Sequence, residues 1–193
     1  FAGNARTRLY PLPSPDDFYS GDAEEVPGVG LLKDYYAFEW GDALFVAIDP
    51  YWQSPGQVGM SSGMGMGSLA EPPWEEIEDE WIALTAGPDD PWDSTIGDGQ
   101  YEWLKTTLEE SDARWKFIFA HHVLGTGRGA VEMAGLYEWG GHNADGEWEF
   151  DERRPGWDLP IHQLLVENDV TIFFQGHDHL YVRQELDGLI YQE

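Results

Sequence analysis

Short apolar runs separated by turn residues predict an alternation of strands and helices along the chain. Four runs have the length and the aromatic or β-branched content of buried strands. They cover residues 35–40, 43–48, 115–120 and 170–175. Gly41-Asp42 separates the first two runs, so we expect those strands to form a hairpin. A second hairpin is predicted around Asp187-Gly188, between residues 181–185 and 189–192.

Apolar residues three and four positions apart predict two helices in the second half of the chain. One is expected over about 98–111, with Asp98 as its N-cap. The other is expected to run to about Asn168, with Asp158 as its N-cap. The alternation of helix and strand favours neighbouring parallel strands and an α/β fold class. Neither a repeat nor a boundary is visible, so we expect residues 1–193 to form a single domain.

Four further stretches have weaker patterns. Residues 1–33 are rich in Pro, Gly and Asp, which predicts an irregular arm. Residues 53–73 are rich in Gly, Ser and Met, which is typical of a flexible loop. The spaced Trp and Ile side chains of residues 74–85 predict a short amphipathic helix. Residues 123–157 are expected to form a long loop.

Composition narrows the classes of function. The chain has 193 residues and a hydrophobic content of 41%, enough to bury a core and to argue against disorder. Its 37 acidic and 10 basic residues give a formal net charge of -27, which excludes a protein that binds nucleic acid through a basic surface. No apolar run reaches the roughly 18 residues of a membrane-spanning helix. Because the chain has no Cys, disulfides, thiolate metal sites and cysteine nucleophiles are excluded within these residues.

Four of the six histidines directly follow two of the predicted strands. His121 and His122 come after the third strand, and His177 and His179 come after the fourth. The carboxyl ends of parallel strands are where open α/β sheets bind ligands. Imidazole is also the commonest metal-ligating side chain. The pattern therefore predicts a metal site.

The spacing within each pair limits how these histidines can act. His177 and His179 lie two apart, so in an extended segment they point to the same side and can share one metal or hold two. His121 and His122 are adjacent and point to opposite sides, so one is expected to be a ligand. The other could orient that ligand, contact substrate or pack in the core. Spacing alone does not decide which is which.

Other polar residues are secondary candidates. His142 and Arg128 lie in the predicted long loop and could contact substrate, the alternative being ordinary surface residues. His162 falls near the start of a predicted helix, so we expect it to pack or to hydrogen-bond locally. The acidic stretch 89–98 lacks the ligand positions of an EF-hand, which favours a solvated loop over a calcium site.

Two segments resemble a known family. Ala120-His121-His122 and Gly176-His177-Asp178-His179 resemble the later motifs of calcineurin-like metallophosphoesterases, which include purple acid phosphatases and many phosphodiesterases. Residues 36–42 and 46–49 resemble central strands of that family, and the order of strands and helices is similar to that of the family as well.

The resemblance implies a two-metal phosphoester hydrolase built on a β-sandwich flanked by helices. It implies that His121 and His177 bind one metal and that His179 binds the other, with His122 beside them as a catalytic or substrate-side residue. The implied cofactors are two divalent or trivalent ions, and histidine and oxygen ligands suit Zn, Fe or Mn. The implied substrate is a phosphoester, attacked by a water that the metals activate. A secreted or periplasmic location is implied as well.

The family's earlier motifs, Asp-x-His, Gly-Asp-x-x-Asp and Gly-Asn-His, do not occur in these 193 residues. We therefore expect the chain to be the C-terminal portion of such a domain and to be inactive alone. The alternative is a non-catalytic structural or interaction module that retains the scaffold. The sequence leaves the substrate, the metal, the compartment and the oligomeric state open.

Overall fold

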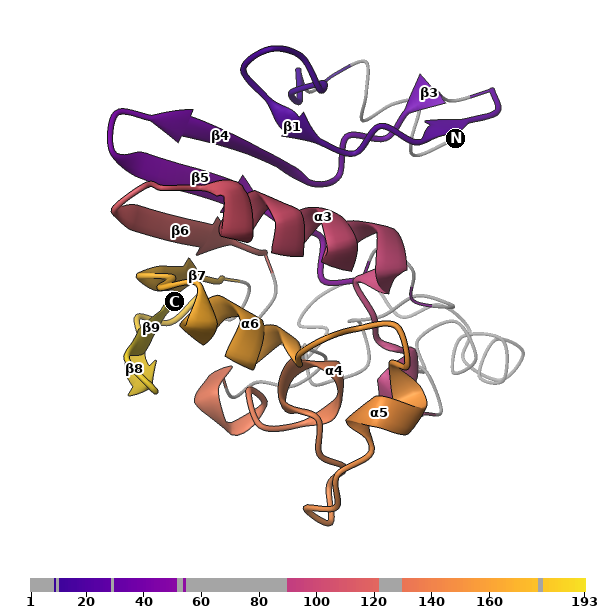
Figure 1. The fold of residues 1–193 in the computed structure, drawn as a ribbon, viewed down its shortest axis with the longest axis vertical. Coiled ribbons are helices and arrows are strands. Elements are labelled where there is room, and N and C mark those ends of the chain that lie inside the picture. Colours follow the sequence, from indigo (N-terminus) through magenta and orange to yellow (C-terminus); the bar gives the residue numbers. More distant parts are fainter. Residues whose placement is uncertain are drawn as a thin grey trace, which may run out of the picture.

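The structure is a computed structural model that describes residues 9, 11–28, 30–51, 54, 90–121, 130–176 and 179–193. Within these residues seven strands form one mixed sheet, in the order β1-β4-β5-β6-β7-β9-β8 (Figure 1). They are β1 (Ser20–Gly21), β4 (Tyr36–Trp40), β5 (Ala43–Ala47), β6 (Trp115–Phe119), β7 (Ile172–Phe174), β8 (Arg183–Leu186) and β9 (Leu189–Gln192). Two further short strands, β2 (Glu25–Val26) and β3 (Gly30–Leu31), pair with each other.

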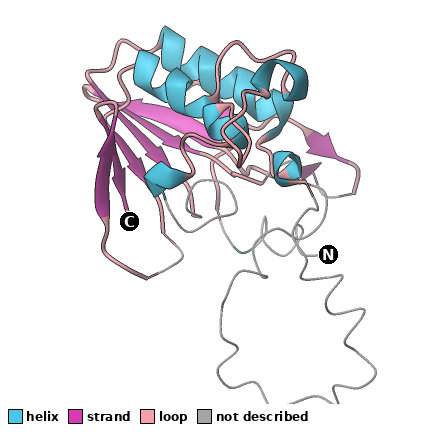
Figure 2. Ribbon diagram, turned by 90° about the horizontal axis from the view of Figure 1, so that it is seen from below, coloured by secondary structure: helices cyan, strands magenta, loops and turns pink. Residues whose placement is uncertain are grey.

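The helices of the described residues are two longer ones and several short turns. They are α3 (Gly97–Glu110), α4 (Tyr137–Gly140), α5 (Phe150–Arg153) and α6 (Ile161–Glu167), with 3-10 turns η2 (Pro91–Asp93) and η3 (Ala130–Glu132). α3 precedes β6 and α6 precedes β7, and both lie over the same face of the sheet (Figure 2). The α/β class predicted from the sequence is confirmed at this level.

Strand pairing follows the predicted alternation. β4 and β5 form the first hairpin, in which Phe38 faces Phe45, and β8 and β9 form the second. β5, β6 and β7 are mutually parallel, with Ile118 opposite Val46 on one side and Phe173 on the other. β9 also runs parallel to β7. Four neighbouring strands therefore point their carboxyl ends to one edge of the sheet.

The helix-covered face of the sheet holds the core. The inward side chains of β5, β6 and β7, such as Val46, Ile118 and Phe173, are fully buried. Leu104 and Leu164, from α3 and α6, are buried in the same apolar cluster. Burial of such side chains is the largest favourable contribution to folding, at about 25 cal/mol for each Å² of apolar surface removed from water. Apolar residues three and four positions apart in each helix thus pack against the alternate residues that point to this face from each strand.

The opposite face of the sheet carries a row of aromatic rings. Phe38 stacks on Phe45 with ring centroids 5.1 Å apart, and Phe119 stacks on Phe174 at 5.0 Å. Phe45 links the two pairs, because its ring also stacks on that of Phe119 with centroids 6.5 Å apart. Phe119 remains 39% exposed. In Figure 2, α3 and α6 lie on the other side of the sheet, so this aromatic face has no cover from them.

Both helix caps predicted from the sequence are wrong. The N-cap of α3 is Ile96, which makes no side-chain capping bond, and Asp98 instead accepts a hydrogen bond of 2.8 Å from the indole of Trp157. The N-cap of α6 is Pro160, and the carboxylate of Asp158 pairs with Lys105. In both cases the carboxylate that we expected to cap the helix instead interacts with a side chain distant in sequence.

Two predicted irregular regions contain regular structure. The expected arm over 1–33 contributes β1, which extends the main sheet by pairing Ser20 with Ala37. The described part of the expected loop 123–157 includes α4 and α5, each only four residues long. Such short helices carry no usable periodicity. The predicted loop 53–73 and helix 74–85 lie outside the described residues, apart from residue 54. Among the helices that are described, none has the length and apolar character needed to cross a bilayer.

The packing of α3 gives a direct test of the core. Leu104→Ala should lower the free energy of unfolding by about 2–5 kcal/mol, because Leu104 is fully buried and its truncation leaves a cavity in the core. The exposed neighbour Glu102→Ala should change it by less than about 0.5 kcal/mol. Urea denaturation of both variants measures the difference. Equal midpoints would mean that α3 does not pack on the sheet as described.

Candidate functional site

The hydrogen-bond ladder between β6 and β7 continues past the ends of both strands. Ala120 donates its backbone N–H to the carbonyl of Phe174 at 2.9 Å. Gly176 then donates its N–H to the carbonyl of His121 at 3.0 Å. A Cβ at Gly176 would lie 3.5 Å from that same carbonyl oxygen, which is ordinary contact. The two histidine motifs of the sequence are therefore joined, backbone to backbone, at the carboxyl edge of the sheet.

The structure describes two of the four strand-end histidines. The backbone of His121 accepts the last hydrogen bond of this ladder, and the residue is exposed. His179 is exposed too, and its backbone has a φ of 57°, in the left-handed region. For a residue with a Cβ that conformation costs about 1–2 kcal/mol, and such outliers concentrate at functional sites. His122 and His177 lie outside the described residues, as does Arg128.

A buried glutamine fixes the neighbouring strand end, after β5. The Gln100 side chain accepts the N–H of Asp49 at 2.8 Å and donates to the carbonyl of Asp49 at 2.8 Å. The Asp49 carboxylate in turn accepts the N–H of Tyr51 at 3.0 Å. Burial, followed by the charge of Asp49, raises the pKa of Tyr51 to about 12. The first turn of α3 is thus tied to the same edge of the sheet as His121.

His142 is held in a local turn between α4 and α5. Its Nδ1 lies 3.0 Å from the carbonyl oxygen of Gly140 and 3.3 Å from that of Gly135. Because carbonyl oxygens only accept hydrogen bonds, Nδ1 must carry the proton, which leaves Nε2 as the lone-pair nitrogen of the neutral ring. The ring also meets that of Trp148 edge-on, at 5.1 Å. The turn depends on Gly140, where a Cβ would lie 2.0 Å from the backbone of Gly135.

A buried ion pair joins three segments beside the start of α3. Glu138 in α4 is 1% exposed and accepts the N–H of Ile96 at 3.0 Å. Arg154 donates to the other carboxylate oxygen at 3.0 Å, and its guanidinium lies 5.5 Å from the Trp92 ring. Burial raises the pKa of Glu138 to about 7, against the lowering effects of Arg154 and the Ile96 N–H. The pair fixes the approach to α3 and carries a proton equilibrium near neutral pH.

A pocket of about 550 Å³ opens beside this ion pair. It is lined by the first turn of α3, including Gly97 and Asp98, and by Arg153 and Arg154. Arg153 pairs with Asp90 at 2.8 Å. Acidic and basic side chains therefore both line the pocket, and both arginines pair with carboxylates outside the lining, Arg153 with Asp90 and Arg154 with Glu138.

The described residues supply imidazoles at the carboxyl edge but not a complete metal shell. Among them, no three His, Asp or Glu side chains are grouped closely enough to hold an ion. His121 and His179 are exposed imidazoles beside the strand ends, and imidazole nitrogen suits Zn, Fe or Mn. A metal centre at this edge would need further ligands from outside the described ranges.

Comparisons with known proteins add no assignment. No protein-family model matches the chain, and no curated protein sequence matches it significantly.

Sequence reasoning missed several residues that shape this region. The links from Gln100 to Asp49 and from Glu138 to Ile96 join residues 51 and 42 positions apart. Glu138 stands between Tyr137 and Trp139, which is a weak signal, whereas Gln100 follows Gly97-Asp98-Gly99 and has none. His162 was expected to pack or to bond locally. It does pack, at 3% exposed, but its hydrogen-bond partners are distant: Nδ1 lies 2.6 Å from the Tyr191 hydroxyl and Nε2 lies 3.0 Å from Asp187, 29 and 25 positions away.

The ion pair gives a pH-dependence test. In the folded protein the pKa of Glu138 is about 7, whereas the ordinary pKa of a glutamate, which applies to the unfolded chain, is 4.5. Between these values the folded state binds more protons, so the free energy of unfolding should fall as pH rises from 4.5 to 7. Glu138→Gln should flatten this part of the profile, measured by urea denaturation at several pH values. The exposed Glu132→Gln should leave it unchanged, and an unchanged profile in Glu138→Gln would contradict the assignment.

Proposed function

We propose that this chain forms part of a metal-dependent phosphoester hydrolase. The observation that carries the proposal is the hydrogen bond of 3.0 Å from the Gly176 N–H to the His121 carbonyl. This bond brings two histidine motifs to neighbouring strand ends, although Gly176 and His121 are 55 positions apart in the sequence. That edge of a parallel sheet is where ligands bind in open α/β folds. The resemblance of both motifs to metallophosphoesterases supplies the reaction class.

In this proposal His121 and His177 hold one metal ion and His179 holds the other. When bound, such a pair of ions polarises a phosphoryl group and activates a water for in-line attack. His122 serves as the catalytic residue beside the ligands. Because His177 follows Gly176 directly in sequence, the bond between Gly176 and His121 limits how far the two ligands can separate.

His142 and Arg128 serve the substrate rather than the metals in this proposal. The carbonyls of Gly135 and Gly140 fix the Nδ1 proton of His142, so Nε2 is the atom available to accept from a substrate hydroxyl or a bridging water. Arg128 carries a positive charge between two glycines, which suits a phosphate oxygen. Both residues belong to the long connection between β6 and α6.

The net charge of the chain supports a metal-dependent reaction. A formal charge of -27 repels a phosphoester in solution. Bound cations reverse the local field and supply the positive potential that the phosphoryl group needs. A phosphoester hydrolase with this composition therefore depends on its metals for substrate attraction as well as for chemistry.

We further propose that the aromatic face of the sheet is one inner face of a β-sandwich. Its central rings, Phe38, Phe45, Phe117 and Phe174, are uncharged and form one connected row. Two sheets pack face to face at about 10 Å through such side chains. A second sheet would cover the exposed part of Phe119 and complete the architecture that the resemblance implies.

A non-catalytic module that keeps the scaffold is the second candidate. It is favoured by the lack of a third His, Asp or Glu beside His121 or His179 within the described ranges. The two functions differ in metal content. A scaffold module binds no metal at these histidines, whereas the hydrolase binds two ions.

The substitution His179→Gly should reduce metal binding without reducing the stability of the metal-free protein. His179→Gly removes a ligand but relieves the left-handed backbone at φ 57°. In the longest natural chain containing these residues, we expect it to lose bound metal while its apo form keeps or gains stability. Tyr181→Ala is the matched control, since Tyr181 is 82% exposed and lies two positions away. Elemental analysis and thermal unfolding of the apo proteins measure both. Full metal content in His179→Gly would refute the ligand assignment.

Activity provides a separate check in the same chain. His121→Ala, His177→Ala and His179→Ala should each abolish metal-dependent hydrolysis of an aryl phosphate monoester or diester. Residues 1–193 alone should show no turnover, because the carboxylate motifs of the resembling family are not among them. Turnover by any of the three variants, or metal-dependent turnover by the 193-residue chain, would contradict the proposed ligand set.

A further inference from the structure

The histidine segment, residues 176–181, is bounded on both sides by hydrogen bonds to the last residues of β9. Gln175, directly before the segment, donates its N–H to the carbonyl of Gln192 at 2.9 Å. Val182, directly after it, exchanges hydrogen bonds of 3.2 and 2.9 Å with the backbone of Glu193. The position of β9 therefore sets where both ends of the histidine segment lie.

The hairpin that contains β9 lies at one end of the sheet. Among the described strands, β8 pairs with β9 alone, and β9 joins the rest of the sheet through three residues paired with β7. So short a pairing makes the position of β9 depend on its side chains as well. Leu189 and Tyr191 are buried in the core, and the Tyr191 ring lies 5.7 Å from that of Phe173 in β7.

A hydrogen-bonded row of three side chains fastens this hairpin to α6. The hydroxyl of Tyr191 lies 2.6 Å from Nδ1 of His162, and the carboxylate of Asp187 lies 3.0 Å from Nε2. Because a carboxylate only accepts hydrogen bonds, Nε2 carries a proton, and Nδ1 of the neutral ring accepts from the tyrosine hydroxyl. Burial, followed by the charge of Asp187, raises the pKa of Tyr191 above its ordinary value, so the hydroxyl keeps the proton that it donates. One helix residue thus holds both β9 and the turn between β8 and β9.

The bond between Tyr191 and His162 is buried, which makes it hard to replace. Tyr191 is fully buried, and His162 is 3% exposed. If the hydroxyl is removed, Nδ1 becomes a buried acceptor that has lost its partner, and the folded state bears the cost of its desolvation. The structure can avoid that cost by letting β9 move away from α6, so that water reaches the imidazole.

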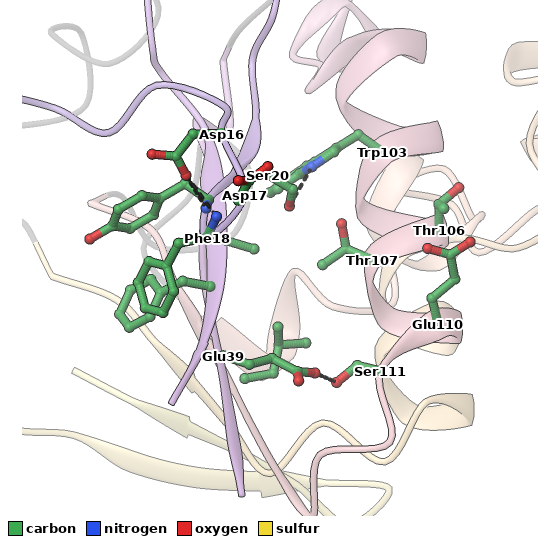
Figure 3. Close-up of a pocket in the computed structure, with 14 residues that line it drawn as sticks. Asp16, Asp17, Phe18, Ser20, Glu39, Trp103, Thr106, Thr107, Glu110 and Ser111 are labelled. Carbon is green, nitrogen blue, oxygen red and sulfur yellow. Dashed lines mark hydrogen bonds between the residues drawn. The ribbon is translucent and has the colours of Figure 1, made fainter. Parts of the chain in front are cut away.

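The other end of the sheet is tied to a helix by a weaker bond. There the indole N–H of Trp103 in α3 donates to the hydroxyl of Ser20 in β1 at 3.2 Å (Figure 3). Both residues line a surface hollow of about 570 Å³, and Ser20 is exposed. Water can therefore replace either partner, so loss of this bond changes little. It provides a matched control for the buried bond.

We propose that the Tyr191–His162 pair positions the histidine segment, and with it His179, by holding β9 against α6. The link runs from α6 through Tyr191 to the last two residues of β9, and from these to both ends of the segment. Its importance for a metal centre rests on the proposed hydrolase, whereas the link itself does not. Tyr191 and His162 are positioning residues, since neither belongs to the proposed ligand set.

Amide hydrogen exchange in the metal-free protein, using the longest natural chain that contains these residues, measures the link. Tyr191→Phe removes only the hydroxyl and should raise exchange at the Gln175 and Val182 amides about tenfold relative to the Ile118 amide in β6, because β9 opens locally. Ser20→Ala removes the matched bond at the other end of the sheet and should leave that ratio unchanged.

Leu108→Ala controls for a general loss of stability. Leu108 is fully buried in α3, and its carbonyl accepts from Lys116 near the start of β6, at the edge of the sheet opposite the histidines. This variant should lower the thermal midpoint at least as much as Tyr191→Phe, because it leaves a core cavity, without changing the exchange ratio. An unchanged ratio in Tyr191→Phe, or an equal rise in Leu108→Ala, would overturn the proposal.

Metal affinity, measured by competition with a chelator, tests what the link does for the ligands. Tyr191→Phe should weaken metal binding about tenfold, whereas Ser20→Ala should weaken it less than about twofold. Unchanged affinity in Tyr191→Phe would overturn the positioning role even if the exchange ratio rises. If the wild-type chain binds no metal, the proposed hydrolase fails, and the exchange ratio still decides whether Tyr191 controls the histidine segment.

Discussion

The parallel pairing of β6 with β7 is the constraint on which the rest of the structure depends. Ile118 and Phe173 face each other in this pairing and are fully buried under the helices, while Phe117, Phe119 and Phe174 pack on the opposite face. Shifting either strand by one residue would exchange these two faces, so burial fixes the register. The same register then aligns the strand ends, and the bond between Gly176 and His121 follows from it. A position set by the core thereby becomes the position of the candidate site.

Much of the fold could be predicted because it depends on local patterns. Gly41-Asp42 and Asp187-Gly188 mark both hairpins, and the alternation of helix and strand gives the parallel centre. The helix caps could not be predicted, because Trp157 and Lys105 compete for the carboxylates of Asp98 and Asp158 from distant positions. α4 and α5 are too short to have a period, and β1 pairs through only two residues.

For the candidate site, strand-end placement was the predictable part. Apolar runs locate the ends of β6 and β7, and histidines directly after them must lie at the carboxyl edge once the strands are parallel. The surrounding polar contacts were not predictable, because Gln100 and Glu138 act through backbone groups more than 40 positions away. Hydrophobic periodicity describes which side of an element is buried. It says nothing about which buried polar side chain will meet which strand end.

The excess of acidic residues gives the chain a formal net charge of -27, which attracts cations and repels anions. At the histidine edge, metal ions would offset the charge of -27 and make phosphoester binding possible. The measurement that tests this central claim most directly is an anomalous-scattering map of the longest natural chain, crystallised with its own metals. We predict two neighbouring peaks, one contacting His121 and His177 and the other contacting His179. A map without metal at these histidines, in a protein whose fold matches the one described, would contradict the account.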